Sequence, residues 1–314
     1  MVGMRMPGNL ARRGLGSIER MSDPGSRSTS PVVPESTPTP PAPVTTTPPS
    51  SGALTASLVS RVELAPGIVD LYFLMRNPPA LRFRGGQFVS MAVGDTPLPQ
   101  IGGGGQTAPP LSGTANGTSP ARRSYSIASP SNQSNRLRFI IRVIPDGTAS
   151  DYLMSLALGA EVRMTGPHGF FVLDPQHPGD IVFGATGTGV SAVLPMLSEL
   201  AGASTGTVTA VPVAGRRLLY WGVRHEADLF ARAEIEALCR EARCDLRLYL
   251  TSPPTGWHGE QGRITAAILA AYPRLKSPTF YLVGNGAMIS ELKRELIALG
   301  VNRKKQIRTE AFFD

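Results

Sequence analysis

The fold of the C-terminal half is decided by residues 181–189, IVFGATGTG. An apolar run that enters a glycine-rich turn and continues into an apolar 190–201 is typical of a buried strand followed by a helix. Glycines let a backbone approach a pyrophosphate closely, and the N-terminus of the following helix favours its charge. We therefore expect a phosphate-binding turn, and assign to it Thr186, Gly187, Thr188 and Gly189.

Strand and helix patterns alternate regularly around this turn. Expected strands are 181–185, 218–223, 245–250 and 279–283, and expected helices are 189–201, 228–242, 263–272 and 286–299. Such alternation implies a parallel sheet with helices on both faces. Residues 175–314 are therefore predicted to form an α/β, Rossmann-like domain.

The preceding part of the chain has a different pattern. Short strands are expected at 54–64, 68–76, 122–128, 137–144 and 160–165, with a further one entered from the turn at 85–87 and one helix at 148–158. This predicts an antiparallel β-barrel domain over 53–174. Its Gly/Pro/Thr-rich stretch 95–120 is interpreted as a flexible insertion, with a functional flap as the alternative. Residues 1–52, rich in Pro, Ser and Thr, are predicted to be a disordered extension.

A second motif lies in the barrel half. Arg123-x-Tyr125-Ser126 falls inside an expected strand, where alternation places Arg123 and Tyr125 on one face. A guanidinium suits a pyrophosphate, and a tyrosine ring can lie against a flat heterocycle.

Three motifs together carry a family resemblance. R-x-Y-S at 123–126, ATGTG at 185–189 and GNGAM at 284–288, in this order, resemble the ferredoxin–NADP reductase family over residues 54 to 314. The resemblance implies a flavoprotein oxidoreductase whose barrel binds FAD and whose α/β domain binds NADPH or NADH.

The resemblance also implies the flavin contacts. Arg123 would pair with the pyrophosphate, Tyr125 would stack on the isoalloxazine, and Ser126 would place a hydroxyl near the reactive flavin nitrogen. Residues 147–153 match the family's G-x-x-S-x-x-L pattern, which opens a helix whose free amides would hold the pyrophosphate. The alternative is that Thr148 or Ser150 is an ordinary N-cap of this helix. The remaining expected flavin contacts are Arg142, Val143, Gly147, Thr148, Ala149 and Ser150.

On the nicotinamide side, Arg224 and Arg263 are candidates for a 2′-phosphate, which slightly favours NADPH over NADH. Further expected coenzyme contacts are Gly284, Asn285 and Met288. The family usually has a cysteine where this chain has Val283, so we expect an apolar wall without the thiol and a slower enzyme.

The tail resembles the family's Glu-x-aromatic ending. The carboxylate of Glu310 would lie near the flavin, and the ring of Phe312 would cover it. With Ser126 they are the expected catalytic residues. For Phe312 the alternative is the hydrophobic end of a C-terminal strand.

Composition limits the partners. The net charge of +8, from 31 Lys and Arg against 23 acids, suits an acidic electron carrier. Scattered basic residues and 6% aromatics argue against nucleic-acid binding, and no apolar run reaches the roughly 20 residues that span a bilayer. Two cysteines, Cys239 and Cys244, cannot hold an iron–sulfur cluster or a closed zinc site, so we expect no metal, and a reducing cytoplasm fits.

The predicted function is electron transfer from NAD(P)H through FAD to a separate ferredoxin or flavodoxin, by a monomer that can serve a monooxygenase. Two alternatives stay open. One is a reductase of free flavin, quinone or ferric chelate. The other is a degenerate nucleotide-binding subunit of a larger complex, to which Val283 lends slight support.

Overall fold

The structure is a computed structural model that describes residues 53–94, 121–132, 135–174, 177–205 and 215–313. The predicted extension 1–52 and the predicted insertion 95–120 lie outside the described residues. The described residues fall within one compact unit, Pro48–Asp314. None of the described helices is long and apolar enough to cross a lipid bilayer.

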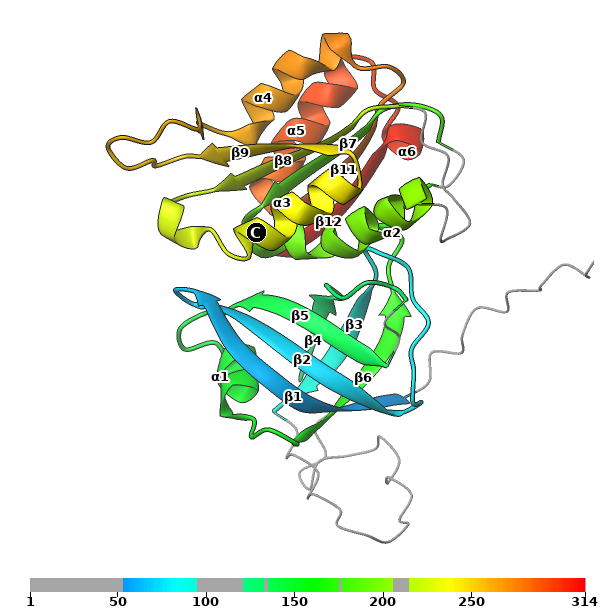
Figure 1. Ribbon diagram of the computed structural model, residues 1–314, viewed down its shortest axis with the longest axis vertical. Helices are drawn as coiled ribbons and strands as arrows, with labels where there is room; N and C mark the ends of the chain where they lie inside the picture. The colour runs from blue at the N-terminus through cyan, green and yellow to red at the C-terminus, as the bar shows by residue number, and fades with distance from the viewer. Residues whose placement is uncertain (1–52, 95–120, 133–134, 175–176, 206–214, 314) are drawn as a thin grey trace, which may run out of the picture. The chain divides into compact units, whose positions relative to one another are not determined.

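The first half forms the expected antiparallel, barrel-like sheet of six strands, in the order β4-β3-β6-β1-β2-β5 (Figure 1). Alternate apolar side chains such as Leu71, Phe73 and Phe139 turn inward and are fully buried. The strands are β1 (Ala53–Ala65), β2 (Ile68–Asn77), β3 (Phe88–Val93), β4 (Ala121–Ser126), β5 (Arg136–Arg142) and β6 (Glu161–His168), with α1 (Thr148–Ser155) between β5 and β6.

The second half forms the expected α/β layer structure. A six-stranded parallel sheet has the order β10-β9-β8-β7-β11-β12, with α4 and α5 on one face and α2 and α3 on the other (Figure 1). Its strands are β7 (Ile181–Thr186), β8 (Arg217–Val223), β9 (Cys244–Leu250), β10 (Glu260–Gln261), β11 (Thr279–Asn285) and β12 (Ile307–Phe313). The helices are α2 (Leu194–Thr205), α3 (Arg232–Glu241), α4 (Ile264–Ala271), α5 (Gly286–Ala298) and the short α6 (Arg303–Gln306). The domain boundary between 174 and 175 stays a prediction.

One helix start differs from its prediction. The helix expected from residue 189 begins at Leu194, because Gly187–Ala192 forms a 3₁₀ turn, η1. A continuous α-helix from residue 189 would place Pro195 in its interior, where proline lacks the N–H needed for the bond to residue 191. At the second position of α2 that missing donor costs nothing.

A second difference concerns the helix expected at 228–242. Glu226–Asp228 forms a separate 3₁₀ turn, η2, and α3 begins only at Arg232. Ala231 lies between η2 and α3 and has a left-handed backbone conformation, with φ 45°. This conformation is unfavourable for continuing a right-handed helix.

The chain's last strand was considered from the sequence only as the alternative for Phe312. Ile307–Phe313 pairs in parallel with β11, and Glu310 lies opposite Val283. Phe312 lies on this strand and is partly buried against the core, and its predicted role beside the flavin stays a prediction. Both cysteines are free and buried, at the end of α3 and the start of β9.

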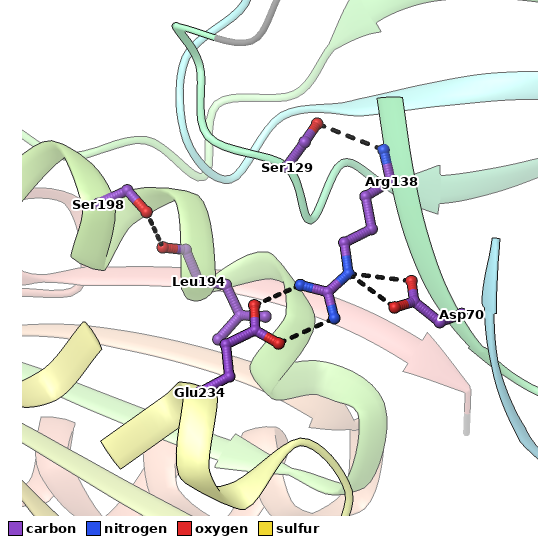
Figure 2. Close-up of polar contacts among 6 residues, drawn as sticks. All are labelled: Asp70, Ser129, Arg138, Leu194, Ser198 and Glu234. Atoms are coloured by element: carbon purple, nitrogen blue, oxygen red, sulfur yellow. Dashed lines mark hydrogen bonds and ion pairs between the residues drawn. The ribbon is translucent and has the colours of Figure 1, made fainter. Parts of the chain in front are cut away.

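A buried arginine links the two sheets. Arg138 on β5 donates from Nε to both carboxylate oxygens of Asp70 on β2, at 2.9 and 3.0 Å. Its two terminal nitrogens donate to the two carboxylate oxygens of Glu234 on α3, as Figure 2 shows. Burial alone would lower the pKa of Arg138, but the bonds to Glu234 and Asp70 raise it above its ordinary value. Arg138 therefore stays charged and holds one acid from the barrel and one from helix α3 of the α/β half.

Replacing Arg138 with methionine is expected to reduce the free energy of unfolding by about 3 kcal/mol, because it leaves the buried Asp70 without its cation. Glu234→Gln keeps the Arg138–Asp70 pair and removes a partly exposed acid, so a loss of about 1 kcal/mol is expected. Urea denaturation followed by circular dichroism measures both.

The matched control is Arg232→Gln, which removes an exposed pair with Glu236 one turn along α3. A loss of about 0.5 kcal/mol or less is expected there. Equal losses in all three variants would show that Arg138 contributes no more than a surface ion pair.

Candidate functional site

A cavity of about 550 Å³, here called the barrel cavity, lies where β4, the end of β5, α1 and β12 meet. Nine predicted site residues line it: Arg123, Tyr125, Ser126, Arg142, Ala149, Ser150, Thr188, Glu310 and Phe312. The other lining residues are Ser124, Ile140, Ile141, Ile144, Ser191 and Ala311. Segments almost 190 residues apart thus form one concave surface with cationic, aromatic and aliphatic parts.

Tyr125 gives the cavity a flat aromatic wall. Its ring packs edge-on against Phe139, with centroids 6.5 Å apart and planes at 68°. Burial raises the pKa of Tyr125 to about 12, so its phenol is neutral at physiological pH. Ser126 follows it on the strand and is buried.

The two adjacent arginines of β4 differ in their contacts. Arg122 is tied to the barrel by bonds to Ser90 and Thr165. Arg123 is exposed, and its NH1 donates only to the carbonyl of Arg122, at 2.9 Å. Arg123 therefore has donors available for an anion in the barrel cavity.

The start of α1 offers amides without a side-chain cap. Gly147 is the N-cap and contributes no side-chain bond, so neither Thr148 nor Ser150 is the ordinary N-cap. The hydroxyl of Ser150 instead accepts from the amide of Ile144, at 2.9 Å. Gly147, Thr148 and Val143 do not line the cavity, and Val143 packs against the barrel core.

Glu310 places a carboxyl group in this mainly apolar surrounding. Burial raises the pKa of Glu310 to about 7. The carboxyl is therefore partly protonated near neutral pH and can both donate and accept a proton.

A second cavity of about 620 Å³, here called the sheet-end cavity, lies at the carboxyl ends of β7, β8 and β11. Seven predicted residues line it: Arg142, Thr186, Gly187, Arg224, Arg263, Asn285 and Met288. The other lining residues, none of which had been assigned to the site from the sequence, are Gly222, Val223, Asp228, Thr251, Ile264, Thr265, Ala287 and Glu291. Arg142 borders both cavities, and its NH2 lies 3.0 Å from a carboxylate oxygen of Asp228.

The glycines of the two turns have different roles. Gly187 has φ 54°, and a Cβ there would meet open space, so a ligand could approach the backbone. Gly189 and Gly284 line neither cavity. A Cβ on Gly189 would come within 2.9 Å of the Cα of Gly284, so these glycines allow the two turns to pack together.

Asn285 is a helix cap at this position. Its Oδ1 accepts from the amide of Met288 at 3.0 Å, and its own amide donates to the hydroxyl of Thr186 at 2.9 Å. These bonds fix the start of α5 against the end of β7.

The cationic side of the sheet-end cavity is only partly neutralised. Arg263 lies 3.5 Å from Glu291, and both side chains are substantially exposed. Arg224 is exposed and has no ion pair with any residue that the structure describes. The cavity can therefore accept additional negative charge.

The residues of both cavities fit two nucleotide cofactors. The barrel cavity combines a tyrosine ring and isoleucines with two guanidinium groups, which suits a flat heterocycle joined to a pyrophosphate. The sheet-end cavity lies at the carboxyl ends of parallel strands, where such sheets bind dinucleotides. The fold and site define an oxidoreductase that uses FAD and NAD(P).

Comparison with known proteins gives the family. Residues 111–173 match an oxidoreductase FAD-binding domain, and residues 183–294 match an oxidoreductase NAD-binding domain. The chain is 33% identical over 260 residues to ferredoxin–NADP reductase B of Sorangium cellulosum (strain So ce56), covering 79% of this chain and 93% of the relative. The chain therefore belongs to the ferredoxin–NADP reductase family.

Two further comparisons agree. The chain is 31% identical over 194 residues to the ferredoxin–NAD(P)(+) reductase component of naphthalene 1,2-dioxygenase/salicylate 5-hydroxylase systems from Ralstonia sp, covering 61% of this chain and 56% of the relative. A ferredoxin NADP+ reductase from Neisseria gonorrhoeae with bound FAD and NADP shares the fold, with a TM-score of 0.63 and 19% identity, over 83% of this chain and 99% of that one.

Glu310 predicts a specific pH dependence for the flavin-free protein. A carboxyl with a pKa of about 7 when folded and 4.5 in its unperturbed state binds more protons in the folded chain between these values. The Glu310 contribution to stability is therefore present below pH 4.5 and is lost as the pH rises to 7.

Urea denaturation of the wild type and of Glu310→Gln at pH 4.5, 6 and 7.5 tests this. The variant is expected to gain stability relative to the wild type as the pH rises. A difference between the two proteins that does not change with pH would contradict the raised pKa.

Proposed function

We propose that this chain passes electrons from NAD(P)H, through bound FAD, to a ferredoxin or flavodoxin. One observation carries the proposal: the barrel cavity brings together Arg123, Tyr125 and Ser126 from the barrel with Thr188 and Glu310 from the α/β half. When bound, FAD accepts a hydride from the nicotinamide and releases electrons singly.

The chain's own residues supply binding and proton control. Arg123 would hold the pyrophosphate of FAD, and the free amides at the start of α1 would add donors. The rings of Tyr125 and Phe312 would lie against the flat isoalloxazine ring of FAD. The buried Ser126 hydroxyl and the Glu310 carboxyl would hold a proton beside it, with Glu310 able to exchange it near neutral pH.

For the coenzyme, we propose a preference for NADPH. Arg224 and Arg263 border the sheet-end cavity at the end of β8 and the start of α4, where a ribose phosphate would lie. A guanidinium forms strong charge-assisted bonds with a phosphate, and Arg224 has no competing ion pair among the described residues.

The acceptor is proposed from charge. The chain carries a net charge of +8, which favours encounter with a small acidic carrier. The relative from Ralstonia sp is named for a ferredoxin, which supports the same class of acceptor. A cytoplasmic location, a monomeric state and service to a monooxygenase stay predictions.

Anaerobic titration of the FAD-loaded protein with NADPH and separately with NADH tests the first half-reaction. NADPH is expected to bleach the flavin absorbance faster than NADH. For the second half-reaction, we expect turnover when a ferredoxin is added. We expect no turnover when free flavin, quinone or ferric chelate is the only acceptor. Bound flavin that neither coenzyme reduces would favour the degenerate subunit, and Val283→Cys would then be the first variant to make.

The coenzyme preference is tested by the double variant Arg224→Gln/Arg263→Gln. We expect the Kd for NADPH to rise about tenfold or more, since charge-assisted bonds to the phosphate are lost, while the Kd for NADH is unchanged. Arg294→Gln, an exposed arginine of α5 paired with its neighbour Glu295, is the matched control. Equal weakening of both coenzymes would show that the arginines do not read the 2′-phosphate.

A further inference from the structure

A third cavity lies at the opposite end of the parallel sheet from the coenzyme cavity. It has a volume of about 670 Å³ and is formed by the amino halves of β8 and β9 together with α4 and the segment that follows it. Its size is that of small-molecule sites, which range from about 300 to 1,000 Å³. We call it the arginine pocket.

The arginine pocket lies over the last two long strands of the sheet, β8 and β9. The two-residue β10 pairs only with Tyr249 and Leu250 at the carboxyl end of β9. The amino half of β9 therefore has no neighbour on that side among the described residues. Three alternate residues of β9, Asp245, Arg247 and Tyr249, line the pocket.

The pocket has more cations than local acids can neutralise. Arg216 is paired with Asp180 at 3.0 Å, and Arg247 with Asp245 at 2.8 Å. Arg243 and Arg274 are exposed, and neither has an ion pair with any residue in the described ranges. Apart from Arg217, four guanidinium groups of the pocket are balanced by only two carboxylates, Asp245 in the lining and Asp180 beside it, which leaves a surplus of about two positive charges.

Arg217 also borders the pocket but is engaged elsewhere. Its NH1 donates to the carbonyls of Leu200 and Ala242. We therefore do not assign it to a ligand.

A tyrosine hydroxyl opens into the pocket without a hydrogen-bond partner among the described residues. Tyr220 is only 6% exposed, and its hydroxyl makes no hydrogen bond to any residue that the structure describes. Its ring is stacked on that of Tyr249, with centroids 6.3 Å apart and planes at 26°. Burial raises the pKa of Tyr220, so the hydroxyl is a neutral donor, and positive charge from Arg247, Arg216 and Arg274 acts on it.

Because the Tyr220 hydroxyl is accessible in the pocket and has no partner among the described residues, it is available to a ligand. A donor hydroxyl among guanidinium groups is arranged for an anion, whose oxygens accept from both. The flat Tyr249 ring and the small alanine and leucine side chains of the opposite wall suit an aromatic body.

We infer that the arginine pocket is a binding site for an aromatic phosphate, with the phosphate held by Arg243, Arg274 and the Tyr220 hydroxyl and the aromatic ring lying against Tyr249. The site is separate from the FAD and NAD(P) cavities, with which it shares no lining residue.

The probe is 1-naphthyl phosphate, titrated by its fluorescence into FAD-loaded protein whose coenzyme cavity has been saturated with NADP+. Saturable binding of one equivalent is expected. Arg243→Gln/Arg274→Gln is expected to raise the Kd at least about tenfold, and Tyr220→Phe about threefold or more, since charge-assisted and neutral hydrogen bonds are lost respectively.

The matched control is Arg303→Gln/Lys304→Gln, which removes the same two charges from the exposed α6 and is expected to leave the Kd unchanged. Neutral 1-naphthol is expected to bind far more weakly, and inorganic phosphate to compete. No saturable binding, or equal weakening by the α6 control, would overturn the inference. Retained flavin and unchanged reduction by NADPH verify that the variants fold, and these readouts do not depend on the pocket.

Discussion

One buried cation, the guanidinium of Arg138, ties the barrel to the α/β half of the chain. It is shared by Asp70 of the barrel and Glu234 of α3, and its planar geometry satisfies both acids at fixed angles. Arg142 lies four residues along the same strand and reaches Asp228 in the turn before α3. Strand β5 therefore holds the segment from Asp228 to Glu234 at two points.

The two points differ in strength because they differ in exposure. Arg138 is 7% exposed, and breaking a buried pair leaves an uncompensated charge. The Arg142–Asp228 pair is accessible to water, which screens it, so it can exchange partners at little cost. The fixed contact lies in the core, and the exchangeable contact lies at the cavities.

Much of the fold could be predicted from local patterns. The strand–turn–helix signal at residues 181–189 and the alternation after it predicted β7, β8, β9 and β11 within two residues. The start of α2 was predicted wrongly at residue 189, although Pro195 favours a start close before it. Strand β12 could not be predicted from local patterns, because residues 307–313 become a strand through pairing with β11, which depends on tertiary structure.

The site residues also divide into those that a local motif predicts and those that only the tertiary structure brings together. Motif residues such as Arg123, Tyr125 and Glu310 were named from the sequence, and the structure brings them to one cavity. Arg138 carries no local signal, since its partners lie 68 and 96 residues away. The grouping of Tyr220 with the arginines around it likewise could not be predicted from local patterns, because the pairing of β8 with β9 and the packing of α4 bring them together.

The position of Arg142 has a thermodynamic consequence. It borders the barrel cavity and the sheet-end cavity, and its side chain has a fixed set of donors. An anion in one cavity that draws the guanidinium away from Asp228 changes the charge that the other cavity presents. Such an effect is reciprocal: whatever factor the first ligand applies to the affinity of the second, the second applies to the first. One side chain thus makes the occupancies of the two cavities a coupled equilibrium.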